Sequence, residues 1–289
     1  MKISGAAIIR NGVKLKFPFV ESIRSVLPLC GEFVVAVGDS DDGTRERIES
    51  INDPKIKIID TKWDMDKRSG GQVLSEQTNI ALCGCSGDWI FYIQSDEAVS
   101  EKDFDKINLA VDAASKRDDI DGLAFGYLHF YGSYNTFQSG KNWYPQEIRL
   151  VKNDKSIVSH GDAQGFRKNG KKLRGIACGA DIYHYGWARQ PEVMAEKIRS
   201  FHKLWHDDSW VEKNCSNKSL PEFYTDLGNL REFRGSHPAA MSELVSGDSS
   251  DFILKCRDQY LKKRGLLAFA KDALRRTMIG QHRNFILVK

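Results

Sequence analysis

Acidic and polar side chains follow an apolar run in the first third of the chain. Residues 89–93 read Trp-Ile-Phe-Tyr-Ile, which predicts a buried strand, and Gln94, Ser95, Asp96 and Glu97 come directly after it. In open α/β sheets ligands bind beyond the carboxyl ends of the strands, where carboxylates can hold a divalent cation against a phosphate. The segment therefore indicates a cation-assisted phosphate site, with a solvated acidic turn as the alternative.

A second acidic cluster follows another apolar run, residues 33–37. There Asp39 and Asp42 could accept hydrogen bonds from a base or a ribose, and Thr44 could cap the next helix. The alternative is an Asx-rich turn in which Asp42 is a plain cap. Two such clusters, on strands that we expect to be neighbours in the sheet, favour a binding site over two unrelated turns.

The elements that must position these clusters alternate between strand and helix over about 115 residues. This alternation predicts an α/β fold with a mostly parallel sheet and helices on both faces. Aromatic and glycine-rich strands follow, and the chain from about residue 191 has a mainly helical pattern. We expect strands at 3–9, 33–37, 56–59, 88–93, 122–132, 147–151 and 182–187, and helices at 17–27, 44–51, 73–82 and 101–115.

The composition indicates an ordinary globular protein. Of 289 residues, 41% are hydrophobic and 28% charged, and the net charge of +4 without a basic tract interleaved with aromatics argues against nucleic-acid binding. The six cysteines include no CxxC pair, so we expect free thiols in a reducing cytoplasm. Residues 1–10 lack the features of a signal peptide, and no apolar run is long enough to span a bilayer.

The two acidic clusters, together with residues 9–12 and 17–25, resemble those of family 2 glycosyltransferases with the GT-A fold. The chain also resembles lipopolysaccharide-core and surface-glycan glycosyltransferases within that family. The resemblance covers most of residues 1–190. It implies a GT-A catalytic domain there, with a donor-binding half over about 1–115 and an acceptor half over about 116–190. Residues 191–289 would form a mainly helical extension.

The resemblance also implies a nucleotide-diphosphate sugar donor, a UDP-sugar by default, and a Mn²⁺ or Mg²⁺ ion. Asp39 and Asp42 match the positions that contact the base and ribose, and Asp96 matches the metal-binding acid. Gln94 stands where a first Asp is usual, and an amide can bind a ribose hydroxyl but adds no charge. The remaining donor-site candidates are Arg10 in the first motif, Ser95, and Arg68 in the glycine-containing stretch 67–71.

Three further residues complete the candidate site. His184, within Tyr-His-Tyr-Gly-Trp, matches a histidine of related enzymes and would bind the metal or the diphosphate. A hydrogen-bonded core histidine is the alternative. Asp162 is our first candidate for the base that deprotonates the acceptor, and Glu147 is the second. The alternative for Asp162 is an ordinary loop carboxylate, and the alternative for Glu147 is a salt-bridged strand residue.

The resemblance therefore implies a cytoplasmic glycosyltransferase of surface polysaccharide biosynthesis that inverts the anomeric centre and acts on a glycan or lipid-linked acceptor. Residues 255–283 carry nine Lys or Arg against two Asp, and this basic stretch would contact the inner face of the membrane or dock on its own domain. One rival is a catalytically inactive nucleotide-sugar-binding or scaffolding protein. A sugar-1-phosphate nucleotidyltransferase is less favoured, because residues 9–14 contain a single glycine.

Overall fold

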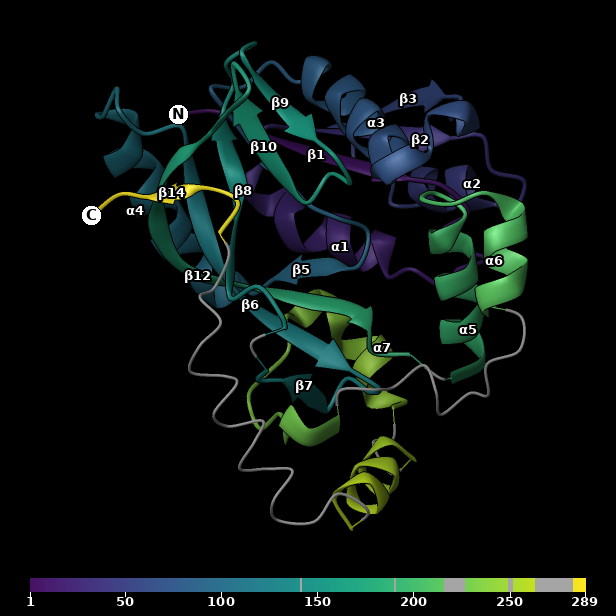
Figure 1. Cartoon of the computed structure of the whole chain (residues 1–289). Coiled ribbons are helices and arrows are strands. Elements are labelled where there is room, and N and C mark those ends of the chain that lie inside the picture. The colour runs from purple at the N-terminus through teal and green to yellow at the C-terminus, as the bar shows by residue number, and fades with distance from the viewer. Residues whose placement is uncertain (141, 190, 216–226, 249–251, 263–282) are drawn as a thin grey trace.

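The protein is built around one large mixed sheet, seen in a computed structural model (Figure 1). The strand order is β13-β7-β6-β8-β4-β1-β2-β3, and β5, β12 and β14 join off this path. Strands β9, β10 and β11 form a separate small sheet. The structure describes residues 1–140, 142–189, 191–215, 227–248, 252–262 and 283–289.

Four parallel strands form the N-terminal half of the large sheet. Strand β1 (Ile3–Ile9) pairs with β2 (Glu32–Gly38) on one side and with β4 (Trp89–Tyr92) on the other, and β3 (Ile56–Thr61) lies beyond β2. The acidic clusters follow β2 and β4, so the prediction that their strands are direct neighbours is wrong. Strand β1, which is buried at every position, lies between them.

Both faces of this half-sheet are covered by helices, as the unbroken apolar runs predicted. Alternate residues of a strand point to opposite faces. Ala7 and Val35 belong to a core shared with α1 (Phe19–Val26) and α4 (Phe104–Ser115), whereas Ala6 and Val34 pack with α3 (Gln72–Cys83). Helix α2 (Thr44–Glu49) follows β2. The predicted α/β class is therefore confirmed.

The second half of the sheet is mixed in direction. β8 runs antiparallel between β4 and β6, whereas β12 runs parallel to β6 along most of its length and antiparallel to β5. The sequence pattern captured only the end of β12 and missed the hairpin of β9 and β10. The bounds are β5 Glu97–Val99, β6 Gly122–Tyr131, β7 Thr136–Gln138, β8 Gln146–Lys152, β9 Ile157–His160, β10 Gly165–Lys168, β11 Lys171–Lys172 and β12 Arg174–Trp187.

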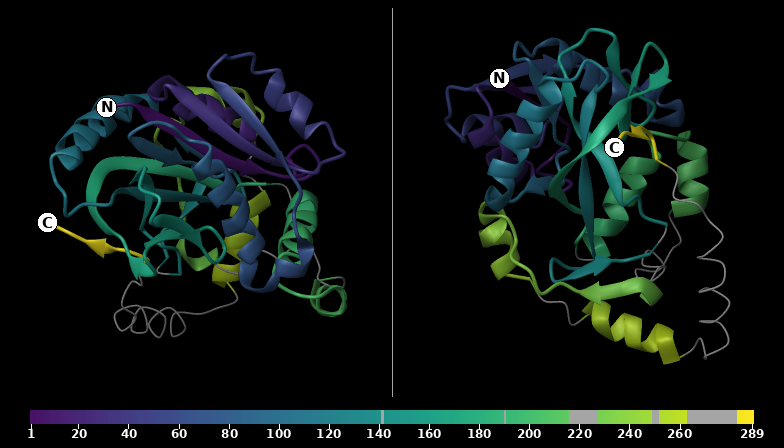
Figure 2. Two further views of the ribbon diagram at one scale, coloured as in Figure 1. Left: turned by 90° about the horizontal axis from the view of Figure 1, so that it is seen from above. Right: turned by 90° about the vertical axis from the view of Figure 1, so that its left-hand side faces the viewer.

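The chain after residue 190 contributes helices and two strands of the large sheet. Helices α5 and α6 pack together and lie beside the loop that precedes α3 (Figure 2). A further helix covers residues 252–262. The labelled elements are α5 (Pro191–His202), α6 (Asp208–Cys215), α7 (Ser242–Ser246), β13 (Leu230–Glu232) and β14 (Ile286–Leu287), and the short 3-10 helices are η1 (Leu27–Leu29), η2 (Met65–Lys67), η3 (Ser69–Gly71), η4 (Glu101–Asp103), η6 (Leu227–Asn229) and η7 (Ala239–Met241).

All six cysteines are unpaired, as predicted from the absence of CxxC pairs. Within the described residues no helix combines the length and apolar character that crossing a bilayer requires. Most of the basic stretch 255–283 lies outside the described residues.

Candidate functional site

The turns after β1, β2 and β4 meet at one edge of the sheet. The guanidinium of Arg10, directly after β1, lies 3.2 Å from the Asp39 carboxylate after β2 and 5.6 Å from the centre of the Trp63 ring. On the other side of β1, the Ser22 hydroxyl of α1 donates to the carbonyl oxygen of Gln94. The predicted donor-site residues are therefore gathered where a ligand of an open α/β sheet would bind.

Asp42 builds the turn after β2. Its carboxylate accepts hydrogen bonds from the backbone N–H of Lys14 at 2.7 Å and of Thr44 at 3.1 Å. Burial alone would raise the pKa of Asp42, but these hydrogen bonds lower it. The Asp39 side chain, in contrast, is 46% exposed, so its carboxylate can reach a ligand while Asp42 holds the turn.

Glu97 is held in a fully buried ion pair. Both its side chain and that of Arg149 are 0% exposed, and two N–O contacts of 2.8 Å join them. The Tyr127 hydroxyl donates to the same carboxylate at 2.7 Å, and the backbone N–H of Gln94 donates at 3.1 Å. With its oxygens used in this way, Glu97 anchors the turn after β4, and Asp96 is left as the carboxylate that can bind a ligand.

Asp96 lies between an ammonium group and an imidazole. Its Oδ2 accepts from Nζ of Lys197 at 2.9 Å, and its Oδ1 lies 3.8 Å from Nε2 of His184. Burial would raise the pKa of Asp96, but the positive charges of Lys197 and Arg189 lower it well below its usual range. Burial lowers the pKa of Lys197 to about 8, against the opposing effect of Asp96. At neutral pH the pair is therefore ionised.

The tautomer of His184 follows from its neighbour His129. Nε2 of His129 lies 2.8 Å from the carbonyl oxygen of Tyr144, so this nitrogen must donate. Burial lowers the pKa of His129 to about 3 and also lowers that of His184, so both rings are neutral. Nδ1 of His129 then accepts from Nδ1 of His184 at 2.9 Å. His184 is left with a lone pair on Nε2, facing Asp96.

This donor set suits a divalent cation. A carboxylate oxygen and an imidazole lone pair 3.8 Å apart can both reach one ion, because each bond to Mg²⁺ is about 2.0–2.1 Å long. Across the described ranges, no three His, Cys, Asp or Glu side chains gather in a group that could hold a metal. Two protein ligands would therefore leave most of the coordination sphere to the oxygens of a ligand such as a diphosphate, and to water.

Asp162 lies in the turn between β9 and β10, beside both the Gln94 segment and the loop before α3. The Gln94 amide donates to the carbonyl oxygen of Ala163 at 3.3 Å. Ala163 is buried with a φ of +61°, a left-handed conformation that costs a non-glycine residue about 1–2 kcal/mol. A Cβ atom on Gly71 would come within 2.9 Å of Cβ of Asp162. The turn is thus held in place from two sides.

Glu147 has a different environment from Asp162. It is 1% exposed, and its Oε2 accepts from the amides of Asn284 at 3.0 Å and Gln164 at 3.3 Å. Burial raises the pKa of Glu147, opposed by Arg149 and these hydrogen bonds. Such contacts suit a residue that ties β8 to the turn of Asp162 and to the C-terminal segment, so Asp162 remains the better placed candidate base.

The remaining predicted residues line the edges of the site. Arg68 lies 3.3 Å from the carboxylate of Asp208 on α6, with 28% of its side chain exposed. Ser95 is partly exposed in the turn between Gln94 and Asp96. Sequence reasoning missed Lys197. The available signal was its place on α5, where it comes one helical turn after the apolar residue Met194 and directly before Ile198, and a lysine is unusual there.

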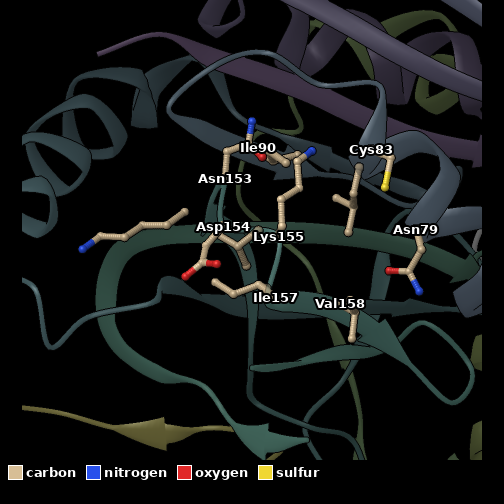
Figure 3. A pocket seen from close by; sticks show the side chains of 11 residues that line it. Asn79, Cys83, Ile90, Asn153, Asp154, Lys155, Ile157 and Val158 are labelled. Carbon is tan, nitrogen blue, oxygen red and sulfur yellow. The ribbon is translucent and has the colours of Figure 1, made fainter. Parts of the chain in front are cut away.

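A separate hollow lies at the C-terminal end of α3 (Figure 3). It is lined by Asn79 and Cys83 of α3 and by Asp154 and Lys155 of the turn after β8. Asp154 is already engaged by Lys168 at 3.0 Å. No residue of the candidate site lines this hollow, so it adds nothing to the chemistry around Asp96.

Comparisons with known proteins give structural similarity only. No protein-family model matches the chain, and no curated protein does. TarS from S. aureus is similar over 77% of this chain and 41% of its own, with 14% identity and a TM-score of 0.39. A TarS 1–349 structure in complex with UDP covers 77% of this chain and 68% of its own, with 12% identity and a TM-score of 0.39.

Glucosyl-3-phosphoglycerate synthase from Mycobacterium tuberculosis, in complex with Mn²⁺, UDP and phosphoglyceric acid, is also similar. It covers 44% of this chain and 43% of its own, with 18% identity and a TM-score of 0.31. This chain therefore spans less than half the length of that synthase and of full TarS. Because identities and TM-scores are this low, the functional proposal rests on the site itself and on the sequence motifs.

Replacing Arg149 with Met tests the buried ion pair. The variant leaves the Glu97 carboxylate buried without its cation, and breaking such a pair costs about 3–5 kcal/mol. We expect the free energy of unfolding, measured by urea titration, to fall by that amount. Arg117→Met, which removes an exposed pair with Asp119, should leave the midpoint nearly unchanged. An Arg149→Met midpoint equal to that of the wild type would contradict the anchoring role.

Proposed function

We propose that this protein is a glycosyltransferase of the GT-A type, similar to family 2. It would move a sugar from a nucleotide-diphosphate donor, a UDP-sugar by default, to a glycan or lipid-linked acceptor. One observation carries the proposal: a buried, ionised Asp96 faces the lone pair of His184 at the sheet edge where Arg10 and Asp39 also lie. A nucleoside diphosphate and a divalent cation match this combination of groups.

The donor would be bound by groups from three strand ends. Asp39 has an exposed carboxylate that can accept from the base or ribose, next to the Trp63 ring and the guanidinium of Arg10. Asp42 contributes by holding the turn. Gln94 and Ser95 lie beside the expected ribose, and Arg68 lies in the loop before α3 on the diphosphate side.

Asp96 and His184 would hold the cation. When bound, Mn²⁺ or Mg²⁺ neutralises charge on the diphosphate. The protein's own part is to keep Asp96 ionised, through Lys197, and to keep His184 neutral with its Nε2 lone pair free, through His129. These two arrangements preset the donor atoms, so little reorganisation accompanies binding.

Asp162 would act as general base. The acceptor hydroxyl oxygen forms a bond to the anomeric carbon, its proton passes to the Asp162 carboxylate, and the carbon–oxygen bond to the diphosphate breaks with its electron pair on the diphosphate. Attack from the face opposite the leaving group inverts the anomeric centre. The fixed turn around Ala163 supports this role, because a base needs a defined position near the acceptor.

A catalytically inactive nucleotide-sugar-binding protein is the second candidate. The observation that favours it is Gln94, whose neutral amide stands where the family has an acid and is bonded to Ala163. Both candidates would work in the cytoplasm, with peripheral membrane contact through the basic C-terminal stretch as part of the proposal. They differ in turnover but share donor binding.

Asp96→Ala tests the donor and cation site. Isothermal titration calorimetry with UDP in the presence of Mn²⁺ should show affinity at least tenfold weaker than in the wild type, about 1.4 kcal/mol, because the proposed carboxylate ligand of the cation is lost. Chelation of Mn²⁺ should weaken binding to the wild type far more than to this variant. Asp105→Ala, on the exposed side of α4, is the matched control and should bind like the wild type. Unchanged UDP affinity in Asp96→Ala would remove Asp96 from the site.

Asp162→Asn tests the base. Release of UDP from a UDP-sugar, measured with an acceptor found by glycan screening, should fall at least 100-fold, since a general base contributes about 10²–10⁴ in rate. UDP affinity should stay within twofold of the wild type. Glu147→Gln is the comparison variant and should keep most of the activity. Loss of turnover in Glu147→Gln alone would move the role to Glu147, and no turnover in the wild type with any acceptor would favour the inactive binding protein.

A further inference from the structure

Lys197 reaches the candidate site from a helix 101 positions further along the chain than Asp96. Its Nζ donates to Oδ2 of Asp96 at 2.9 Å and to the carbonyl oxygen of Gly186 at 2.6 Å. Only 13% of its side chain is exposed. Removing an ammonium group from water costs free energy, and the contact with the Asp96 carboxylate offsets that cost.

The charge balance of the site gives this cation a role beyond pairing. Gln94 carries no charge, Glu97 is neutralised by Arg149, and His184 is neutral, so among the described residues around this site Asp96 is the only carboxylate left for a metal. Lys197 already balances Asp96. Arg189 adds a second cation near Asp96, so a diphosphate of two or more negative charges meets built-in positive charge as well as any metal ion.

The ammonium of Lys197 also has donor capacity to spare. An –NH₃⁺ group has three donors, and in the part of the chain that the structure describes two of them go to Asp96 and Gly186. The Phe17 ring lies 5.0 Å from Nζ, and the guanidinium of Arg189 lies 4.5 Å from the same ring. The aromatic face holds the two cations near Asp96 without taking a hydrogen bond from Lys197.

We propose that Lys197 is a donor-binding residue, a resident cation that contacts the diphosphate of the nucleotide donor and lets it bind in part without metal. This proposal rests on the proposed function, because it assumes that a nucleoside diphosphate occupies the site. It also accounts for Gln94: a site that supplies its own cation needs fewer carboxylates to recruit a divalent one.

The test compares UDP with uridine in the presence of a chelator, by calorimetry. The wild type should bind UDP measurably without metal and more tightly than uridine. In Lys197→Met the metal-free affinity for UDP should fall at least tenfold while that for uridine is unchanged. Lys197→Arg, which keeps the charge, should retain most of the UDP affinity. Lys203→Met, an exposed lysine just after the same helix, is the matched control.

Three results would overturn the assignment. The first is a wild type that binds UDP with Mn²⁺ but not at all in the chelator. The second is a Lys197→Met protein whose metal-free UDP affinity equals that of the wild type. The third is an equal loss of UDP and uridine affinity in a variant that melts like the wild type, which would give Lys197 a structural role only. Failure of the proposed function looks different, because the wild type would then not bind UDP even with Mn²⁺.

Discussion

The buried pair of Glu97 and Arg149 is the interaction on which the site depends. It ends β4 and begins β5, because the Glu97 carboxylate holds the backbone N–H of Gln94 on one side and the Arg149 guanidinium on the other. In the pairing of β5 with β12, Glu97 lies opposite His184. The residue that fixes the turn is therefore also the one that brings His184 beside Asp96. A pair of this kind contributes geometry more than net stability.

Hydrophobic pattern predicted the fold well where burial alone decides the structure. The runs at 3–9 and 33–37 are buried at every position, and no other element type suits short β-branched segments covered on both faces. The pattern failed at β9 and β10, two short strands of mixed apolar and polar residues that form a hairpin whose pairing depends on the turn at Gly161 and Ala163. Local sequence does not reveal a left-handed alanine, because its neighbours impose that conformation.

The site was predictable only where one short motif contains the chemistry. Asp96 stands out at the end of an apolar run, but the ion pair that occupies its neighbour Glu97 is made with Arg149, which lies 52 positions away. The same limit applies to Gln94. In sequence it is a missing acid, whereas in the structure its amide donates to Ala163, which a carboxylate could not do. The change from acid to amide thus exchanges a charge for a fixed position of the turn that holds Asp162.

Elements after residue 190 contribute side chains that contact residues of the candidate site. Helix α5 supplies Lys197 to Asp96, α6 supplies Asp208 to Arg68, and Asn284 near the C-terminus donates to Glu147 beside the Asp162 turn. Each of these contacts joins the late part of the chain to a residue of the candidate site. Because position 94 carries an amide and no charge, the charges around Asp96 and Arg68 are supplied by helices α5 and α6.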